Sequence, residues 1–94
     1  MKNLFKITLK EEYREQCIGY IREHTIHCKS EKGNLVSEAF QSKEDPCVIY
    51  LLSEFDTAEN EALHASSDAD KAFVAKMQGK EAAPPVRFDW TQFA

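Results

Sequence analysis

The sequence predicts an α+β domain with the ferredoxin-like order of elements β-α-β-β-α-α-β and an antiparallel sheet. Three observations predict this class. Apolar residues follow the period of a strand near both ends and in the middle of the chain, with helical periodicity between these stretches. Cap signals mark the starts of two short helices, and Ala83-Pro84-Pro85 separates the second helix from a last strand. The 94 residues have the length of one domain, which we place at residues 1–94.

The first strand and the first helix are distinguished by a change of period. Residues 4–9 are rich in β-forming side chains, and apolar and polar residues alternate over part of this stretch. Residues 11–29 form an amphipathic helix, because one arc of about 120° collects its aromatic, cysteine and histidine side chains. This inward arc holds Tyr13, Cys17, Tyr20, Ile21, His24, His27 and Cys28. Gly33-Asn34 supplies the turn that ends the helix.

Turn and cap signals divide the rest of the chain. A polar turn at residues 41–46 separates two strands, and Asp56-Thr57 and Ser67-Asp68 each precede a helix. The elements so predicted are strands at 35–40 and 48–55, helices that end near residues 65 and 77, and a strand at 86–93.

The strand at residues 48–55 is apolar on both faces. One face holds Ile49, Leu51 and Phe55, and the other holds Val48, Tyr50 and Leu52. Helices on one side of an antiparallel sheet normally leave the opposite face polar and solvated. A chain of this size has no second layer to cover that face. We therefore expect a homodimer in which the sheet faces of two copies pack together.

Composition excludes several classes of partner. The chain has 16 acidic and 12 basic residues and a net charge of -4, which argues against nucleic acid, because phosphate binding needs clustered Lys and Arg. The longest apolar run, residues 48–52, is far shorter than the roughly 20 residues of a membrane span. The first residues lack the apolar core of a signal peptide, so we expect no membrane association and a cytoplasmic location.

The cysteines predict neither a disulfide nor a metal centre. Cys17 and Cys28 would lie about 16 Å apart along a helix, well beyond the roughly 7 Å limit of a bridge. The chain has three Cys, but no Cys-x-x-Cys motif and no His/Cys cluster with the sequence spacing of a zinc site. We expect buried, reduced thiols and no bound metal.

Two stretches of the chain match the motifs of a known family. Residues 27–34, His-Cys-Lys-Ser-Glu-Lys-Gly-Asn, are similar to a helix end that reads Ser-Arg-x-Glu-x-Gly-Asn/Cys. The second stretch starts at Phe55, passes His64 and ends at residues 67–73, Ser-Asp-Ala-Asp-Lys-Ala-Phe. With its element order and length, the chain resembles the antibiotic biosynthesis monooxygenase domain family, small proteins with a dimeric α+β barrel fold. It departs from the family pattern at Phe55, where the family has Trp, and at Ala69, where it has His.

The resemblance implies a pocket between the helices and the sheet face that they cover. Its candidate residues are His64 and His24 as catalytic residues and, for substrate binding, Asn3, His27, Ser53, Phe55, Phe73 and Trp90. Each has a structural alternative: His64 as a surface or capping residue, His24 as a hydrogen-bonded core histidine, and His27 as a partner of the helix dipole. The aromatic residues are alternatively core fillers. Cys28 is not expected to be a nucleophile, since no Cys-His-Asn/Asp arrangement is visible.

The function that the resemblance implies is cofactor-independent oxidation of a small aromatic or quinol-type substrate by molecular oxygen. Such a reaction needs a base, a donor that holds the substrate anion and an apolar cavity that excludes water. Histidine suits the base because its unperturbed pKa of about 6.5 is close to neutrality. His64 or His24 would be the base, and Ser53 or Asn3 the donor. The aromatic walls would be Phe55, Phe73 and Trp90.

Two alternatives stay open at this point. An isomerase-type member would turn Arg22 or Lys29 inward to bind a phosphorylated metabolite, whereas a non-catalytic member would only bind a small molecule. Haem degradation is disfavoured, because the family's iron-binding His aligns with Val74 and its Trp aligns with His64.

Overall fold

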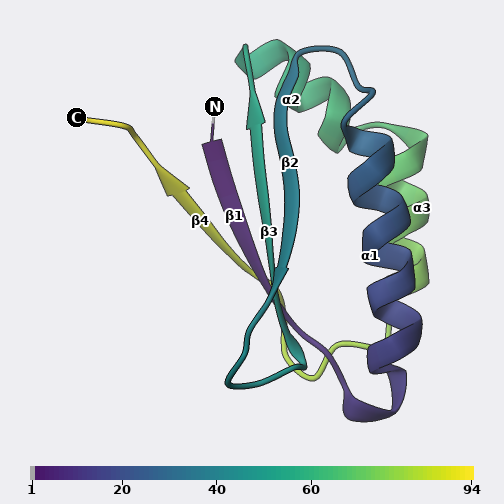
Figure 1. Cartoon of the computed structure of the whole chain (residues 1–94). Coiled ribbons are helices and arrows are strands. Elements are labelled where there is room, and N and C mark those ends of the chain that lie inside the picture. Colours follow the sequence, from purple (N-terminus) through teal and green to yellow (C-terminus); the bar gives the residue numbers. More distant parts are fainter. Residues whose placement is uncertain (1) are drawn as a thin grey trace.

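The computed structural model describes residues 2–94 and contains four strands and three α-helices (Figure 1). In chain order they are β1 (Lys2–Thr8), α1 (Arg14–Cys28), β2 (Asn34–Gln41), β3 (Val48–Phe55), α2 (Ala58–Ala65), α3 (Asp68–Met77) and β4 (Val86–Trp90). A 3-10 turn at Glu11–Tyr13 leads into α1. The predicted α+β class and the ferredoxin-like order of elements are confirmed.

The strands form one antiparallel sheet in the order β2-β3-β1-β4. Helices α1 and α3 run side by side over one face of this sheet, and α2 lies near one end of it (Figure 1). The opposite face carries no element of the described chain (Figure 1). This arrangement gives the sheet one face toward the helices and one open face.

The core lies between the helices and the sheet. Odd-numbered residues of β1 and β3 point toward the helices, and Ile7 and Ile49 face each other across the two strands. The buried hydrophobic cluster consists of Ile7, Leu9, Cys17, Ile21, Cys47, Ile49 and Met77. Buried Ser37 of β2 donates a hydrogen bond to the carbonyl of Thr25 at 2.9 Å, which ties β2 to α1.

The cap signals of the two short helices are confirmed. The Thr57 side chain accepts a hydrogen bond from the backbone N–H of Asn60, and Ser67 accepts one from that of Asp70. Such side-chain acceptors satisfy N–H groups that have no partner within the helix. These caps fix the starts of α2 and α3, and hence the positions of the side chains that follow.

Several predicted boundaries differ by a few residues. The first strand begins at Lys2, and the last strand ends at Trp90 instead of residue 93. Trp90 pairs with Lys2, the first residue of β1, so residues after Trp90 have no residue of β1 to pair with. Tyr13 is the N-cap of α1 and is exposed, contrary to its predicted inward position.

The open face of the sheet is rich in large apolar side chains. In the register, the residues of β4 on this face, Val86, Phe88 and Trp90, pair with Lys6, Leu4 and Lys2. These three β4 side chains are 43–46% exposed, and Phe40 of β2 is 49% exposed. Among the described residues, no helix has the length and apolar character needed to cross a membrane.

Candidate active site

A cavity of about 250 Å³ lies between the helices and the sheet. Its sheet side includes Asn3, Phe5, Leu51, Ser53 and Phe55, and its helix side includes His24, Cys28, His64, Asp70 and Phe73. Phe5, Leu51, Phe55 and Phe73 give the cavity apolar surface, whereas His24, Cys28, His64 and Asp70 form one titratable wall on the helix side. The chemistry of the site therefore depends on that wall.

His64 is held in place by a carboxylate from the loop that follows α1. Its Nδ1 lies 2.7 Å from Oε1 of Glu31, and the two side chains are only 19% and 14% exposed. The ring also lies against Phe55, with centroids 5.1 Å apart. Because the Glu31 carboxylate can only accept a hydrogen bond, Nδ1–H donates it, and Nε2 is left as the acceptor in a neutral ring.

Gly33 shapes the loop that positions Glu31. Its φ of 77° is left-handed, and a Cβ there would collide with Asp56 and Asn60 at the start of α2. The backbone N–H of Asp56 donates to the Gly33 carbonyl at 2.9 Å. The end of α1 and the start of α2 are thereby held close together, which brings Glu31 to His64.

His24 is fixed by an aromatic ring and a carboxylate. Its imidazole stacks on Phe73, with centroids 4.2 Å apart and an interplanar angle of 2°. Its Nε2 lies 3.6 Å from Oδ1 of Asp70, which is also 3.9 Å from Nε2 of His64. Asp70 therefore stands between the two imidazoles.

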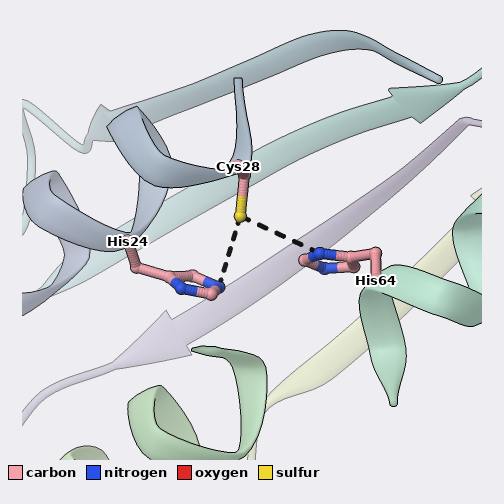
Figure 2. Close-up of side chains that lie close together, drawn as sticks. All are labelled: His24, Cys28 and His64. Atoms are coloured by element: carbon pink, nitrogen blue, oxygen red, sulfur yellow. Dashed lines mark hydrogen bonds between the residues drawn. The ribbon is translucent and has the colours of Figure 1, made fainter. Parts of the chain in front are cut away.

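Cys28 completes this wall. Figure 2 shows its sulfur pointing between the two imidazoles, 3.5 Å from Nε2 of His24 and 3.9 Å from Nδ1 of His64. Burial raises the pKa of the Cys28 thiol well above its ordinary value, and the hydrogen bond to Glu31 and the charges of Glu31 and Asp70 raise it further. A thiol that keeps its proton is a poor nucleophile.

A polar pair lies on the sheet side of the cavity. Ser53 of β3 donates a hydrogen bond to Oδ1 of Asn3 at 3.0 Å, and Asn3 is buried. The two residues pair directly across β1 and β3, so the register itself brings them together. They offer the cavity hydroxyl and amide groups on an otherwise apolar surface.

An ion pair lies elsewhere on the cavity lining. Arg87 of β4 binds Glu61 of α2 at 2.8 Å, and both residues line the cavity. Arg87 also contacts Asp89 at 2.9 Å and lies over the ring of Phe5. Its charge is thus already paired with two carboxylates.

The structure brings six of the eight sequence-derived site residues to the cavity and leaves two outside it. The six are Asn3, His24, Ser53, Phe55, His64 and Phe73. His27 is exposed, because it lies about 100° around the helix axis from inward-facing Cys28. Trp90 belongs to the open face, since it pairs with Lys2 and not with an odd-numbered residue of β1. Arg22 and Lys29 line a different groove, against β2.

The sequence analysis did not name the two carboxylates of this wall as site residues, and it placed Cys28 on the inward arc of the helix without giving it a role in the site. Glu31 was part of the family-like stretch, and Cys28 stands four residues after His24, so both signals were present. The sequence lacks a His/Cys cluster with zinc-site spacing, but folding brings the thiol and the two imidazoles together, with their ligand atoms within 4.8 Å of one another.

Comparison with known proteins agrees with this architecture. A family model described as antibiotic biosynthesis monooxygenase matches residues 1–76. No curated protein sequence matches the chain. A solved structure from Nitrosomonas europaea, assigned to the same family, is 17% identical, with a TM-score of 0.93 over 99% of this chain and 98% of that one.

Two further structures share the fold. One from Bacteroides thetaiotaomicron, also assigned to the family, is 21% identical, with a TM-score of 0.89 over 100% of this chain and 90% of that one. A conserved protein from Methanosarcina mazei is 16% identical, with a TM-score of 0.86 over 93% and 86% of the two chains. Because the family model covers most of its length, the chain belongs to the antibiotic biosynthesis monooxygenase family.

Proposed function

We propose that this protein is a cofactor-independent monooxygenase that oxidises a small aromatic or quinol-type substrate with molecular oxygen. The observation that carries the proposal is His64, which lines the cavity and is oriented by Glu31 at 2.7 Å. Family membership supports oxygenation as the type of reaction. A carboxylate that fixes an imidazole is a common way to prepare a general base.

His64 would begin the reaction by removing a proton from a substrate hydroxyl. Glu31 accepts the hydrogen bond from Nδ1–H, so Nε2 receives the substrate proton and the carboxylate stabilises the resulting imidazolium. The electron-rich substrate anion can then pass an electron to oxygen. One oxygen atom enters the substrate at a ring carbon that loses its hydrogen, and the other leaves as water with that hydrogen and the hydroxyl proton that His64 removed.

The cavity suits a small flat substrate. Its volume of about 250 Å³ is smaller than the roughly 300–1,000 Å³ of sites for drug-sized ligands. Phe55 and Phe73 line it with aromatic surface, which favours stacking on a phenolic ring. The amide of Asn3, held by Ser53, would donate to the substrate anion.

Oxygen consumption tests this proposal directly. Purified protein with a chelator and no added flavin is supplied with a panel of phenols, quinols and anthrones. We expect uptake with at least one compound and a fall in kcat of about 100-fold in His64→Gln. His27→Gln, which changes an exposed histidine of α1, is the matched control and should keep the wild-type rate. No oxygen uptake across the panel, or an undiminished rate in His64→Gln, would overturn the proposal.

We also propose that two copies pair through their open sheet faces, in the cytoplasmic location inferred from the sequence. Phe40, Phe88 and Trp90 expose large apolar side chains on this face. Apolar surface of this kind normally marks an interaction site. A second copy is the occupant whose face matches it by symmetry.

A further inference from the structure

The wall of the cavity holds three groups that are typical metal ligands. They are the sulfur of Cys28, Nε2 of His24 and Nδ1 of His64, and all three lie within 4.8 Å of one another. Two come from successive turns of α1, and the third comes from α2 (Figure 2). Imidazoles spaced by one helical turn from another ligand recur in metal sites because both side chains then share a face.

The distances between these atoms fit a tetrahedral ion. With bonds of about 2.0 Å to nitrogen and about 2.3 Å to sulfur at a tetrahedral angle, neighbouring nitrogen and sulfur ligands lie about 3.5 Å apart. The two sulfur–nitrogen distances here are 3.5 Å and 3.9 Å. The three ligands therefore need only small shifts to coordinate one ion.

The charges around the cluster favour a cation. Glu31 lies 2.7 Å from His64, and Asp70 lies 3.6 Å from His24. Within residues 2–94, these two carboxylates form ion pairs with the two imidazoles and with no Lys or Arg. Two partly buried carboxylates beside a thiol provide negative charge that a bound dication would offset.

We propose that His24, Cys28 and His64 form a binding site for a divalent transition-metal ion of the zinc type. Two imidazoles and a thiolate suit zinc and cobalt and disfavour magnesium and calcium. The ion replaces the proton of the Cys28 thiol, which leaves to solvent. This inference stands on ligand geometry and does not rest on the proposed oxygenation.

The two carboxylates have distinct roles in this site. When His64 binds through Nδ1, its ring proton moves to Nε2, which faces Oδ1 of Asp70 at 3.9 Å. Asp70 then orients the ligand through its outer nitrogen, as carboxylates commonly do around metal-bound histidine. Glu31, released from the Nδ1 proton, is left as a negative charge beside His64.

Occupancy of this site would compete with the proposed base. A metal ion bound to both imidazoles removes them from proton transfer, so the metal-bound protein should not oxygenate by the route above. Metal binding and base catalysis are therefore mutually exclusive uses of the same two imidazoles. Because binding is read by spectroscopy, its failure can be distinguished from failure of the oxygenase.

Titration of the metal-free protein with Co²⁺ tests the inference. We expect one Co²⁺ per chain, visible absorption typical of tetrahedral cobalt and a near-ultraviolet charge-transfer band from the thiolate. Zn²⁺ should displace it. Cys28→Ser should remove the charge-transfer band and weaken binding at least about tenfold, and Glu31→Gln should weaken it about tenfold. Cys47→Ser and His27→Gln, at a distant buried thiol and an exposed imidazole, are matched controls that should bind like wild type.

A second measurement needs no variant. In the wild-type protein, saturating Zn²⁺ should slow alkylation of Cys28, followed by peptide mass spectrometry, and leave Cys47 unaffected. The inference is wrong if Co²⁺ binding does not saturate, if the thiolate band persists in Cys28→Ser, if either control variant loses binding, or if Zn²⁺ leaves the alkylation of Cys28 unchanged.

Discussion

The imidazole of His24 lies parallel to the ring of Phe73, with an interplanar angle of 2° and centroids 4.2 Å apart. The contact joins α1 to α3 directly beneath the cavity wall. An imidazole stacked in this way has one orientation, and its Nε2 is aimed at both Cys28 and Asp70. Phe73 is thus a positioning residue for the whole cluster.

Phe73→Leu should loosen this orientation. Leucine keeps much of the apolar volume but loses the stacked ring, so we expect a loss of stability of about 1 kcal/mol. The free energy of Co²⁺ binding should weaken by more than this loss of folding stability, because the His24 ring gains rotational freedom. Ala72→Leu, at the preceding, exposed position of α3, is the control. Equal Co²⁺ affinities in wild type and Phe73→Leu would contradict the positioning role.

Glu31→Gln should separate binding from catalysis in the proposed oxygenase. The amide keeps a hydrogen-bonding oxygen but loses the charge that stabilises the imidazolium of His64. We expect kcat to fall about 100-fold with little change in KM, measured by oxygen uptake on a substrate found in the panel. Glu23→Gln, an exposed glutamate of α1, should behave like wild type. A fall confined to KM would argue that Glu31 serves binding alone.

Gly33→Ala should destabilise the protein. The residue has a φ of 77°, and the added Cβ would meet Asp56 and Asn60. We expect a loss of about 2 kcal/mol in urea unfolding. Gly79 provides a matched comparison, because its φ is 78° but a Cβ there would meet nothing within 4 Å. Gly79→Ala should lower the free energy of unfolding by only about 1 kcal/mol. Equal losses in the two variants would show that the Cβ at position 33 is accommodated without a steric penalty.

Phe88→Glu should disrupt the proposed dimer. The side chain is 43% exposed on the open sheet face, and a buried carboxylate without a partner is costly. We expect sedimentation of wild type as a dimer and of the variant as a monomer. Leu63→Glu, at an exposed position of α2, should leave the dimer intact. A monomeric wild-type protein at micromolar concentration would exclude the dimer.

Stability should decline at alkaline pH through the buried thiols. Burial raises the pKa of the thiols of Cys17 and Cys28 above the ordinary value of 9.0. Unfolded thiols ionise above that value while the folded ones keep their protons, so this contribution is present below about pH 9 and lost as the pH rises. Each thiol contributes up to about 1.4 kcal/mol per pH unit. Urea unfolding between pH 8 and 10 should show a shallower decline for Cys28→Ser than for wild type, and parallel curves would contradict the assignment.

Local patterns in the sequence were enough for most of the fold. The strand predicted at residues 48–55 coincides with β3, because a continuous apolar run is bounded by turn and cap signals. Thr57 and Ser67 cap α2 and α3 as expected, since capping depends on only a few neighbouring residues. Boundaries failed where a partner strand decides them, as at Trp90.

The site required contacts that no local pattern encodes. The sequence was enough to propose His24 and His64 individually as site residues. It does not show that Glu31 and Asp70 lie beside these imidazoles, because that depends on how the helices pack. The cluster joins a loop and three helices, so its geometry depends on how α1, α2 and α3 cross the sheet. Residue types and spacing therefore indicate the candidates, whereas tertiary packing selects among them.

Trp90 illustrates what the sequence determines and what the tertiary structure decides. The alternation of Val86, Phe88 and Trp90 with Arg87 and Asp89 determined by itself that β4 has one apolar face. Whether that face meets the helices or the open side was decided by the pairing of Trp90 with Lys2. The physical reason is that a shift of one residue in register turns every side chain of a strand to the opposite face. Only the assembled sheet sets that register.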